Sequence, residues 1–373
     1  MFIKNGYPDI VYFVKPSEDN DELKYSLRSL KNLNHGQVYL VGYRPSWVDK
    51  KYEFISTNQN SDKYQNVRNN WLAALTDERI SDDFVLMNDD FFIMQPTKNI
   101  PVLRRLKNIE HYINIYSKLK NDGRYVTEMK QARDILNSWG FSDISSYELH
   151  TPMLINKKKM LNLLSKFNGC TSQLRTIYGN YYNIGGKKII DVKIIRDDQD
   201  NSFDTQFIST IDESFEDGKI GHFLRKKFAK VLIFSHANDP DGLLSVILAQ
   251  LAFAEVDYLL TNNPQSDITK YLDQKKTSLG SYDFIFICDI YPGLPVLKKI
   301  PDAHWFDHKN HSLEKIKQHN LKLKNTHIAT EVSGVPASAS SIFYRWLVKE
   351  KLLGREPSSF VEFVRQVDTW DFK

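Results

Sequence analysis

The chain has 373 residues, of which 41% are hydrophobic and 26% are charged, and its formal net charge is +4. This length predicts two domains, and the composition is typical of a globular protein. The small, dispersed charge tolerates an anionic substrate without requiring one. The cysteines, Cys170 and Cys288, lie far apart and form no CxxC pair, which argues against a disulfide framework and a structural zinc site.

Neither the start of the chain nor its apolar segments suit secretion or a membrane. Met1–Asp9 lacks the apolar run of a signal peptide. The longest apolar stretch, Leu243–Ala254, is too short to span a bilayer and predicts a buried helix. We therefore expect a cytoplasmic protein without a membrane span.

Strand-like and helix-like segments alternate at the start of the chain. Runs of β-branched and aromatic residues predict strands, and apolar residues at helical spacing predict helices. In chain order, the expected elements are strand Asp9–Lys15, helix Glu22–Leu33, strands Gln37–Tyr43 and Tyr52–Ser56, helix Asn66–Leu75 and strand Asp83–Met87. This alternation predicts an α/β fold with a sheet covered on both faces.

The later part of the chain repeats this pattern after a largely helical stretch. Helices are expected within Arg104–Phe141 and over Tyr147–Phe167 and Ser172–Tyr182. Strand–helix alternation then restarts near Lys230 without a linker, so we expect domains over residues 1–228 and 229–373. The second domain should contain strands Lys230–Ser235, Phe284–Asp289 and His304–Asp307, with helices Gly242–Glu255, Ala339–Lys349 and one from Ser358.

Four short segments of the second half carry acids or histidines at a strand end or near a helix. They contain His236, Asp239 and Asp241; then Asp289; then Asp307, His308 and His311; and finally Asp368 and Asp371. A single Asp after a strand is usually a turn or cap residue, and a single His is usually structural, but four such segments in series favour a site. Ligands of α/β sheets bind at the carboxyl ends of strands, so the segments could converge. Carboxylates and imidazoles without thiolates suit Mn²⁺ or Mg²⁺.

In order and spacing, these segments resemble motifs I to IV of the DHH phosphoesterase family, over nearly all of Lys230–Lys373. The nearest likeness is to the oligoribonuclease branch of nano-RNase B type, whose ending is similar to Phe360–Trp370 and whose helix start is similar to Ser338–Tyr344. The resemblance implies a parallel α/β domain that hydrolyses phosphodiester bonds, including those of short RNA, with two Mn²⁺ ions.

The resemblance also implies a role for each matching residue. The metal ligands would be His236, Asp239, Asp241, Asp289, Asp307, His308 and Asp368. Among them Asp289 would bridge the ions, and Asp289, Asp307 and His308 would form the catalytic centre. Ser338 and Ser340 would hold a substrate phosphate at a helix start, where free N–H groups favour anions. His311 would be a further substrate contact, and Asp371 a neighbour rather than a ligand.

Three features depart from the family. The naming motif reads Asp307-His308-Lys309, so its second histidine is missing, and His311 stands two places later. His236 lies one residue farther from Asp239 than in the nearest branch. The family's second, substrate-binding domain (DHHA1) does not appear before Lys373, so we expect a truncated sequence, a domain that works differently, or a separate chain that supplies the missing part.

In the first half, the strand Asp83–Met87 leads into Asn88, Asp89 and Asp90. An acidic pair after a strand caps a turn, or it holds a divalent ion against a diphosphate as in GT-A sugar-nucleotide enzymes. The surroundings favour the second interpretation. Over about Asp9–Phe215 the chain resembles Stealth-type transferases of phage and capsule loci, on the segments Glu22–Leu30, Asn66 to Asn69, Asn88–Phe92, Tyr147–Pro152 and Arg175–Tyr181.

This second resemblance implies a GT-A-like domain with a mixed sheet that transfers a sugar or sugar phosphate from a nucleotide-sugar donor. Asp89 and Asp90 would hold Mn²⁺ or Mg²⁺, while Asn88, His150 and Arg175 would bind substrate. A structural role for His150 is an equal alternative. The Asp-Gly-Ser region of the capsule enzymes is replaced by Lys15–Asp19.

Two functions of different classes stay open. In the first, a metal-dependent phosphoesterase is fused to a nucleotide-sugar-dependent transferase. In the second, only the transferase acts, and the DHH-like part is a weakly active or non-catalytic binding module. The expected partners are short RNA or another phosphodiester, a nucleotide-sugar donor, and a chain that supplies the missing substrate-binding domain.

Overall fold

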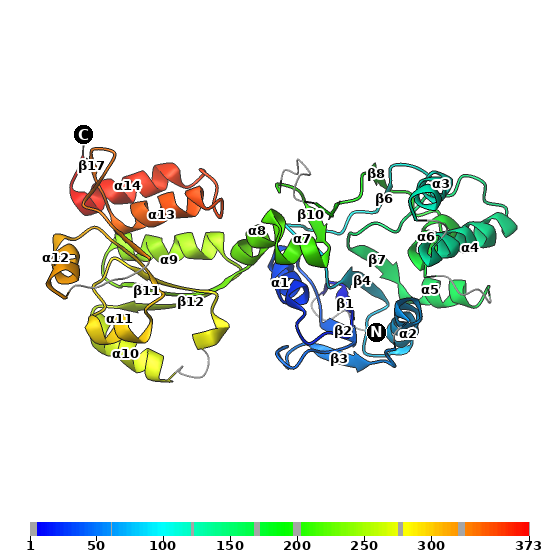
Figure 1. Cartoon of the computed structure of the whole chain (residues 1–373), viewed down its shortest axis with the longest axis horizontal. Helices are drawn as coiled ribbons and strands as arrows, with labels where there is room; N and C mark the ends of the chain where they lie inside the picture. The colour runs from blue at the N-terminus through cyan, green and yellow to red at the C-terminus, as the bar shows by residue number, and fades with distance from the viewer. Residues whose placement is uncertain are drawn as a thin grey trace. The chain divides into compact units, whose positions relative to one another are not determined.

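The computed structural model describes residues 6–60, 62–120, 123–167, 172–196, 203–274, 279–319 and 325–372. The chain divides into two compact α/β units, Met1–His222 and Phe223–Lys373 (Figure 1). The division falls inside helix α8 (Lys219–Lys227), before the expected boundary after Phe228. Cys170 lies outside the described residues. Within the described ranges, no helix has both the length and the apolar character needed to cross a membrane.

The N-terminal unit is built on a five-stranded sheet with the order β3-β2-β1-β4-β7. Its strands are β1 (Asp9–Val14), β2 (Val38–Gly42), β3 (Glu53–Ser56), β4 (Asp83–Asn88) and β7 (Met153–Asn156). All neighbours run parallel except β7, which is antiparallel to β4. Side chains of β1 alternate between two apolar clusters, with Tyr12 in one and Phe13 in the other, because successive residues of a strand face opposite sides. The mixed α/β fold expected from the sequence is confirmed.

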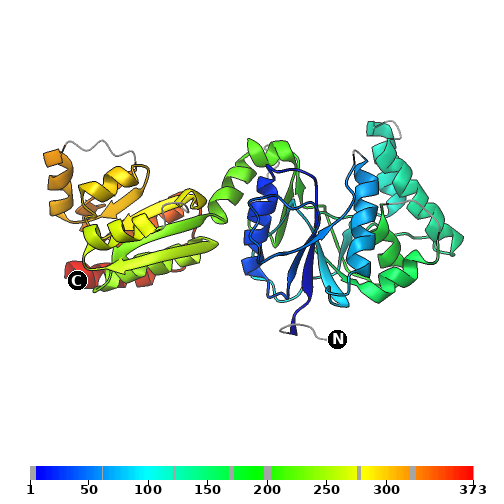
Figure 2. The same cartoon turned by 90° about the horizontal axis from the view of Figure 1, so that it is seen from below.

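Helices cover both faces of this sheet (Figure 2). Helix α1 (Asp21–Ser29), capped by the side chain of Asn20, packs on one face. Helix α2 (Lys63–Thr76), capped by Asp62, packs on the other. The second face is extended by α3 (Ile109–Lys120), α4 (Arg124–Ser138), α5 (Lys157–Leu164) and α6 (Leu174–Tyr181).

The expectation of a continuous helix over Tyr147–Phe167 is wrong, because this stretch contains β7. Met and Leu in β7 are good helix formers, but pairing with β4 outweighs their local preference. The strand ends where the Asn156 side chain accepts a 3.0 Å hydrogen bond from the backbone N–H of Lys159 and so caps α5.

Short strands complete the N-terminal unit. A three-stranded sheet is formed by β5 (Phe91–Ile93), β10 (Phe207–Thr210) and β9 (Lys193–Ile194), and a separate pair by β6 (Leu103–Arg105) and β8 (Lys187–Ile189). A short helix, α7 (Asp212–Glu216), follows β10, and a 3₁₀ turn, η2 (Leu30–Asn32), follows α1. None of these short elements was predicted as such from the sequence, because two to five residues carry too little periodicity.

The C-terminal unit contains a five-stranded sheet in which every neighbouring pair is parallel. Its order is β12 (Glu255–Thr261), β11 (Lys230–His236), β13 (Phe284–Cys288), β14 (His304–Asp307) and β15 (Thr326–Ile328). The interior strand β11 carries a continuous apolar run, Val231–Phe234, because both faces of the sheet are covered by helices.

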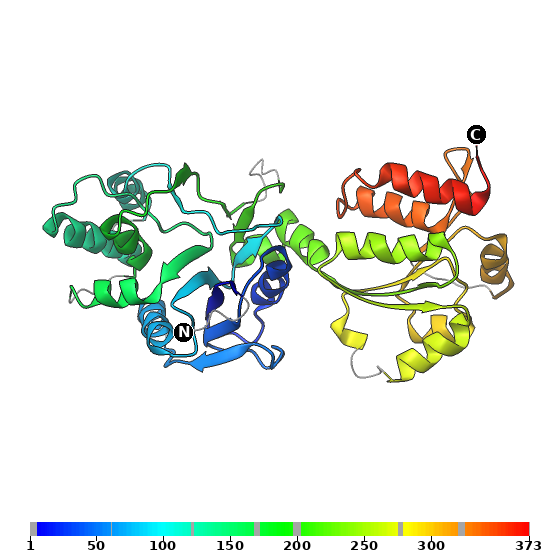
Figure 3. The same cartoon turned by 180° about the vertical axis from the view of Figure 1, so that it is seen from behind.

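Helices α9 (Pro240–Ala252), α13 (Ala339–Lys349) and α14 (Ser358–Thr369) cover one face of this sheet, and α10 (Pro264–Gln274) and α11 (Leu294–Lys299) cover the other (Figure 3). The Phe343 ring of α13 lies 5.1 Å from that of Phe286 and 4.8 Å from that of Phe306. Burial of each such ring stabilises the fold by roughly 1.5–3 kcal/mol, so this cluster fixes α13 against the sheet. The remaining elements are η3 (Leu279–Ser281), α12 (Asn310–His319), β16 (Glu331–Val332) and β17 (Val335–Pro336).

Candidate functional site

Three neighbouring strands of the C-terminal unit bring their ends to one edge of the sheet. The register pairs Ser235 with Cys288 and Cys288 with Phe306. The residues that follow these three along their strands are His236, Asp289 and Asp307. Because the strands are parallel, these residues meet at the edge where ligands of α/β sheets bind.

A tight turn joins β11 to α9 at this edge. The Asp239 side chain caps α9 by accepting a 2.8 Å hydrogen bond from the backbone N–H of Gly242. A Cβ at Gly242 would lie 2.3 Å from the carbonyl oxygen of His236, so only glycine lets α9 begin this close to the strand. The turn therefore keeps Asp239 and Asp241 next to the strand end.

A first group of ligand atoms belongs to His236, Asp239 and Asp289, all within 4.8 Å of one another. The Nδ1 atom of His236 contacts the Asp239 carboxylate and lies 3.6 Å from Oδ2 of Asp289. Burial alone would raise the pKa of Asp239, but hydrogen bonds from Gly242 and His236 outweigh it and hold the pKa below its usual value. These hydrogen bonds therefore stabilise the anionic form of Asp239, which is the form that binds a cation.

A second group consists of Asp241, Asp289 and His308, so Asp289 belongs to both. The Nε2 atom of His308 lies 3.4 Å from Oδ1 of Asp289 and 3.9 Å from Oδ2 of Asp241. Asp368 of α14 joins this group, with its Oδ2 atom 3.4 Å from the same nitrogen. Burial, together with the charge of Asp241, raises the pKa of Asp368 to about 6.

Three atoms of these groups are buried without a hydrogen-bond partner among the described residues: Oδ2 of Asp289, Nε2 of His308 and Oδ2 of Asp368. Buried polar atoms of folded proteins are nearly always satisfied. Burial, as the largest influence, raises the pKa of Asp289 above its usual value. A cation in each ligand group would give these atoms partners: one beside Oδ2 of Asp289 in the first group, and one beside His308 and Asp368 in the second.

Asp289 also has an unusual backbone. Its φ angle is +61°, in the left-handed region that costs a residue with a side chain roughly 1 kcal/mol. Its N–H nevertheless donates a 2.9 Å hydrogen bond to the carbonyl of Phe306. The chain therefore turns sharply at the end of β13, and the Asp289 carboxylate is fully buried.

The start of α13 holds the Asp241 carboxylate. Backbone N–H groups of Ala339 and Ser340 donate to it at 2.8 and 2.9 Å, and the Ser340 hydroxyl donates as well. Ser338 instead caps α13, accepting from the N–H of Ser341. Ser340 therefore bonds to a carboxylate of the chain, and Ser338 bonds within its own helix. Both serines are fully buried, so neither lies at an open phosphate site.

Asp307, His311 and Asp371 lie outside both ligand groups. Asp307 accepts from the backbone N–H groups of His308 and Lys309 and from the Ser312 hydroxyl, so it stabilises the turn that presents His308. His311 is exposed, and its ring packs edge-on against Tyr291. Asp371 pairs with Arg365 at 3.0 Å.

Lys309, noted in the sequence only as a departure from a motif, contacts the centre directly. Its Nζ atom donates to Oδ1 of Asp289 at 2.6 Å and to the carbonyl oxygen of Asp289 at 2.8 Å. Lys309 follows His308 directly in the sequence, and this adjacency could have indicated that it lies close to the site.

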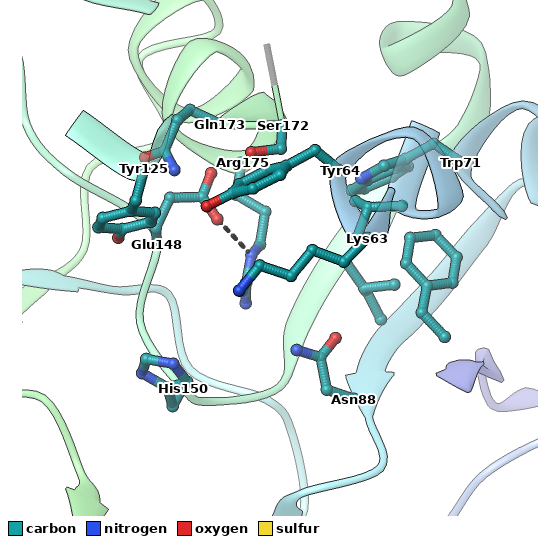
Figure 4. A pocket seen from close by; sticks show the side chains of 13 residues that line it. Lys63, Tyr64, Trp71, Asn88, Tyr125, Glu148, His150, Ser172, Gln173 and Arg175 are labelled. Atoms are coloured by element: carbon teal, nitrogen blue, oxygen red, sulfur yellow. Dashed lines mark hydrogen bonds and ion pairs between the residues drawn. The ribbon is translucent and has the colours of Figure 1, made fainter. Parts of the chain in front are cut away.

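A cavity of about 310 Å³ lies in the N-terminal unit (Figure 4). It brings together Asn88, His150 and Arg175, which the sequence had grouped from three separate segments. The Nε atom of Arg175 donates to Glu148 at 3.0 Å, so the guanidinium is fixed in the wall. The His150 ring is held from outside the cavity by Asp191, whose Oδ2 lies 2.8 Å from Nδ1.

Asp89 and Asp90 are not among the described residues that line this cavity. Asp89 is buried and accepts a 2.7 Å hydrogen bond from Asn20. Burial and the charge of Asp90 raise the pKa of Asp89 to about 6. Asp90 pairs with Lys193 at 2.9 Å and accepts from the Ser209 hydroxyl at 3.0 Å. The acidic pair and the other three residues therefore occupy different surroundings.

Sequence reasoning missed most of the cavity wall. Its aromatic side chains come from β1, α2 and α4, as Phe13, Tyr64, Trp71 and Tyr125, and Lys63 adds a cation. Tyr64, Val67 and Trp71 recur at the spacing of one helix face, which was the pattern that could have indicated a shared surface. Asn66 and Asn69 of the same helix bond instead to the preceding loop, at Asn60 and Asn58.

Comparison with protein-family models and with curated proteins gives no match. Among solved structures, the chain is similar to an uncharacterized protein from Helicobacter pylori G27, with 21% identity and a TM-score of 0.32. The match covers 38% of this chain and 43% of that protein, which is less than half of either. A similarity of this size indicates no function.

Proposed function

We propose that the C-terminal unit hydrolyses phosphodiester bonds with two divalent metal ions. The observation that carries this proposal is that Asp289 is shared by two ligand groups, one with His236 and Asp239 and the other with Asp241 and His308. A carboxylate between two ions a few ångströms apart is typical of enzymes that cleave phosphate esters with a metal pair.

The donor atoms fit such ions. Both groups offer carboxylate oxygens and imidazole nitrogens without a thiolate, which suits Mn²⁺ or Mg²⁺. The buried unpartnered atoms of Asp289, His308 and Asp368 would each gain a partner. The ligands would therefore be His236, Asp239, Asp241, Asp289, His308 and Asp368.

The chain's own residues hold these donors in place. When bound, the ion pair would polarise a phosphodiester and make water a stronger nucleophile. Helix α13 fixes Asp241, Gly242 fixes one oxygen of Asp239, and the Asp307 turn presents His308. Donors fixed in this way need little reorganisation during the reaction. Groups that hydrogen-bond to metal ligands commonly change the metal affinity by about tenfold to a hundredfold.

Hydrolysis of bis(p-nitrophenyl) phosphate and of a dinucleotide in Mn²⁺ tests this proposal. We expect slow hydrolysis that EDTA abolishes, and Asp289→Ala should lower the rate by about a hundredfold or more because both groups lose their shared ligand. Asp371→Asn is the control, since Asp371 belongs to neither group and pairs with Arg365. The dinucleotide also tests whether the substrate class includes short RNA.

Two results would count against this function. Hydrolysis that Asp289→Ala or EDTA leaves unchanged would come from another site. Binding of Mn²⁺ without hydrolysis of either substrate would favour a non-catalytic binding module instead.

The N-terminal cavity supports a second proposal, transfer of a sugar or sugar phosphate from a nucleotide-sugar donor. The specific observation is that Asn88, His150 and Arg175 line one cavity, whose volume of about 310 Å³ suits a small ligand. The cationic side chains of Lys63 and Arg175 could bind phosphate, and the aromatic rings of the wall could stack on a base or sugar. This proposal assigns no metal to Asp90, which is paired with Lys193.

Thermal melts with a panel of UDP-sugars test the second proposal. A ligand at a hundredfold excess over its Kd stabilises by about 2.7 kcal/mol, which corresponds to a shift of roughly 5 °C or more. We expect such a shift for at least one UDP-sugar and its loss in Arg175→Met. Arg79→Met, which changes an exposed arginine outside the cavity, should retain it. A panel without any shift would contradict the transferase proposal.

A further inference from the structure

The two oxygens of the shared Asp289 carboxylate have different surroundings. Oδ2 faces His236 at 3.6 Å and has no hydrogen-bond partner. Oδ1 faces His308 at 3.4 Å and accepts a 2.6 Å hydrogen bond from the Lys309 ammonium. Oδ2 is thus available to a cation, whereas Oδ1 is already paired with the ammonium of Lys309.

Lys309 reaches this buried carboxylate from the surface. Its side chain is 43% exposed, whereas the Asp289 side chain is fully buried. The ammonium is tied to Asp289 twice, through Oδ1 and through the backbone carbonyl oxygen. A lysine stem is flexible and its ammonium is readily hydrated, so the side chain can swing into solvent without disturbing the core.

The charge of the centre explains why a cation is held there. Carboxylates of Asp239, Asp241, Asp289 and Asp368 gather around two imidazoles in a largely buried space. Like charges a few ångströms apart repel strongly in a buried site, because little water is present to screen them. The Lys309 ammonium offsets part of this repulsion, but it would in turn repel a divalent ion bound to Oδ1.

We propose that Lys309 is a resident cation that makes the two ion positions unequal. The position formed by His236, Asp239 and Oδ2 of Asp289 takes a divalent ion first. The position formed by Asp241, His308 and Oδ1 of Asp289 is filled only when the ammonium of Lys309 leaves. This inference rests on the ion pair of the proposed phosphoesterase, and it adds that the second ion enters by displacing a side chain.

Calorimetric titration of Mn²⁺ into the metal-free 373-residue chain tests the inference. The wild type should bind two ions with clearly different affinities. Lys309→Met should increase the Mn²⁺ affinity of the weaker position, at Asp241 and His308, by about tenfold. The affinity of the tighter position should stay nearly unchanged, because the positive charge that is removed lies beside only one of the two ions. Lys309→Arg, which keeps the charge, should preserve the difference. Lys317→Met, which removes a charge from the exposed end of α12, is the matched control and should behave like the wild type.

The stability of the metal-free protein provides a second measurement. Lys309→Met should melt at a lower temperature than the wild type in EDTA and recover in Mn²⁺, whereas Lys317→Met should do neither. If metal-free Lys309→Met is unfolded but refolds with Mn²⁺, the result supports the inference that the ammonium offsets the repulsion among the carboxylates. A variant that Mn²⁺ does not restore would overturn the inference.

The result for Lys309 and the result for hydrolysis can be told apart. Equal affinities in the wild type, or an unchanged weaker affinity in Lys309→Met, would overturn the role of Lys309 even if the enzyme hydrolyses phosphodiesters. Unequal binding that Lys309→Met removes, without hydrolysis of any substrate, would support Lys309 and reject only the phosphoesterase. Absence of Mn²⁺ binding would overturn both.

Discussion

Asp191 connects the wall of the N-terminal cavity to a buried arginine. Its carboxylate accepts from Arg105 at 2.7 Å, and it contacts the ring and the backbone N–H of His150. Burial would raise the pKa of Asp191, but His150 and Arg105 outweigh it and lower the pKa to about 2. The carboxylate is therefore more stable as an anion in the folded chain than in the unfolded chain.

Asp191→Asn should reduce the free energy of unfolding in a pH-dependent way. A folded pKa of about 2, below the unfolded value, gives a stabilisation that is fully present above pH 4 and disappears as the pH falls toward 2. The loss near pH 7 should be about 2 kcal/mol, because each unit of pKa corresponds to about 1.4 kcal/mol. Urea titrations at pH 7, 5 and 3 measure it, and the difference from the wild type should shrink only at the lowest pH.

Asp82→Asn is the control for this comparison. Asp82 pairs with Lys158, but the lysine side chain is 75% exposed, and exposed pairs contribute little to stability. A loss for Asp82→Asn as large as that for Asp191→Asn, or a loss at Asp191 that does not change with pH, would contradict the assignment.

At the scale of one helix, the start of α13 acts as a support for Asp241. The two backbone N–H groups of Ala339 and Ser340 would otherwise be free at the helix terminus, and the positive end of the helix dipole favours the carboxylate that they bind. A helix start that sequence reasoning assigned to substrate phosphate is thus used to hold an acidic residue of the chain.

Ser340→Ala should weaken Mn²⁺ binding by about tenfold or more, because Asp241 loses the hydroxyl that orients it. Isothermal calorimetry measures this change. Ser338→Ala removes the cap of the same helix without removing a bond to Asp241, and caps contribute about 1 kcal/mol to stability. We expect Ser338→Ala to lower the melting temperature and leave the Mn²⁺ affinity nearly unchanged. Equal effects of the two variants on the affinity would mean that helix stability, not Asp241, is what matters.

At the scale of the whole molecule, the sequence predicted the main strands well. β1, β2, β4, β11 and β13 are runs of β-branched and aromatic residues bounded by polar ones, and such runs carry their own indication of structure. The edge strand β7 was missed because it is only four residues long and begins with the helix formers Met153 and Leu154, so its strand conformation depends on its partner β4.

The candidate sites were predictable to different degrees. The meeting of His236, Asp289 and His308 follows from parallel strands that end at the same edge, so strand order alone indicates it. The bond between Ser340 and Asp241 joins residues 99 apart in sequence, and no local pattern specifies it. The contacts of Asp89 and Asp90, which are not among the described residues that line the cavity beside Asn88, likewise depend on tertiary partners such as Asn20 and Lys193.

The left-handed backbone of Asp289 limits how this position can change during evolution. Glycine, asparagine and aspartate adopt a φ of +61° with least strain, whereas β-branched residues fit it poorly. Of those three residues, only aspartate offers a charged oxygen to each neighbouring group. A lineage released from selection for this chemistry would therefore drift at position 289 to asparagine or glycine before other residues, and it would keep its fold while doing so.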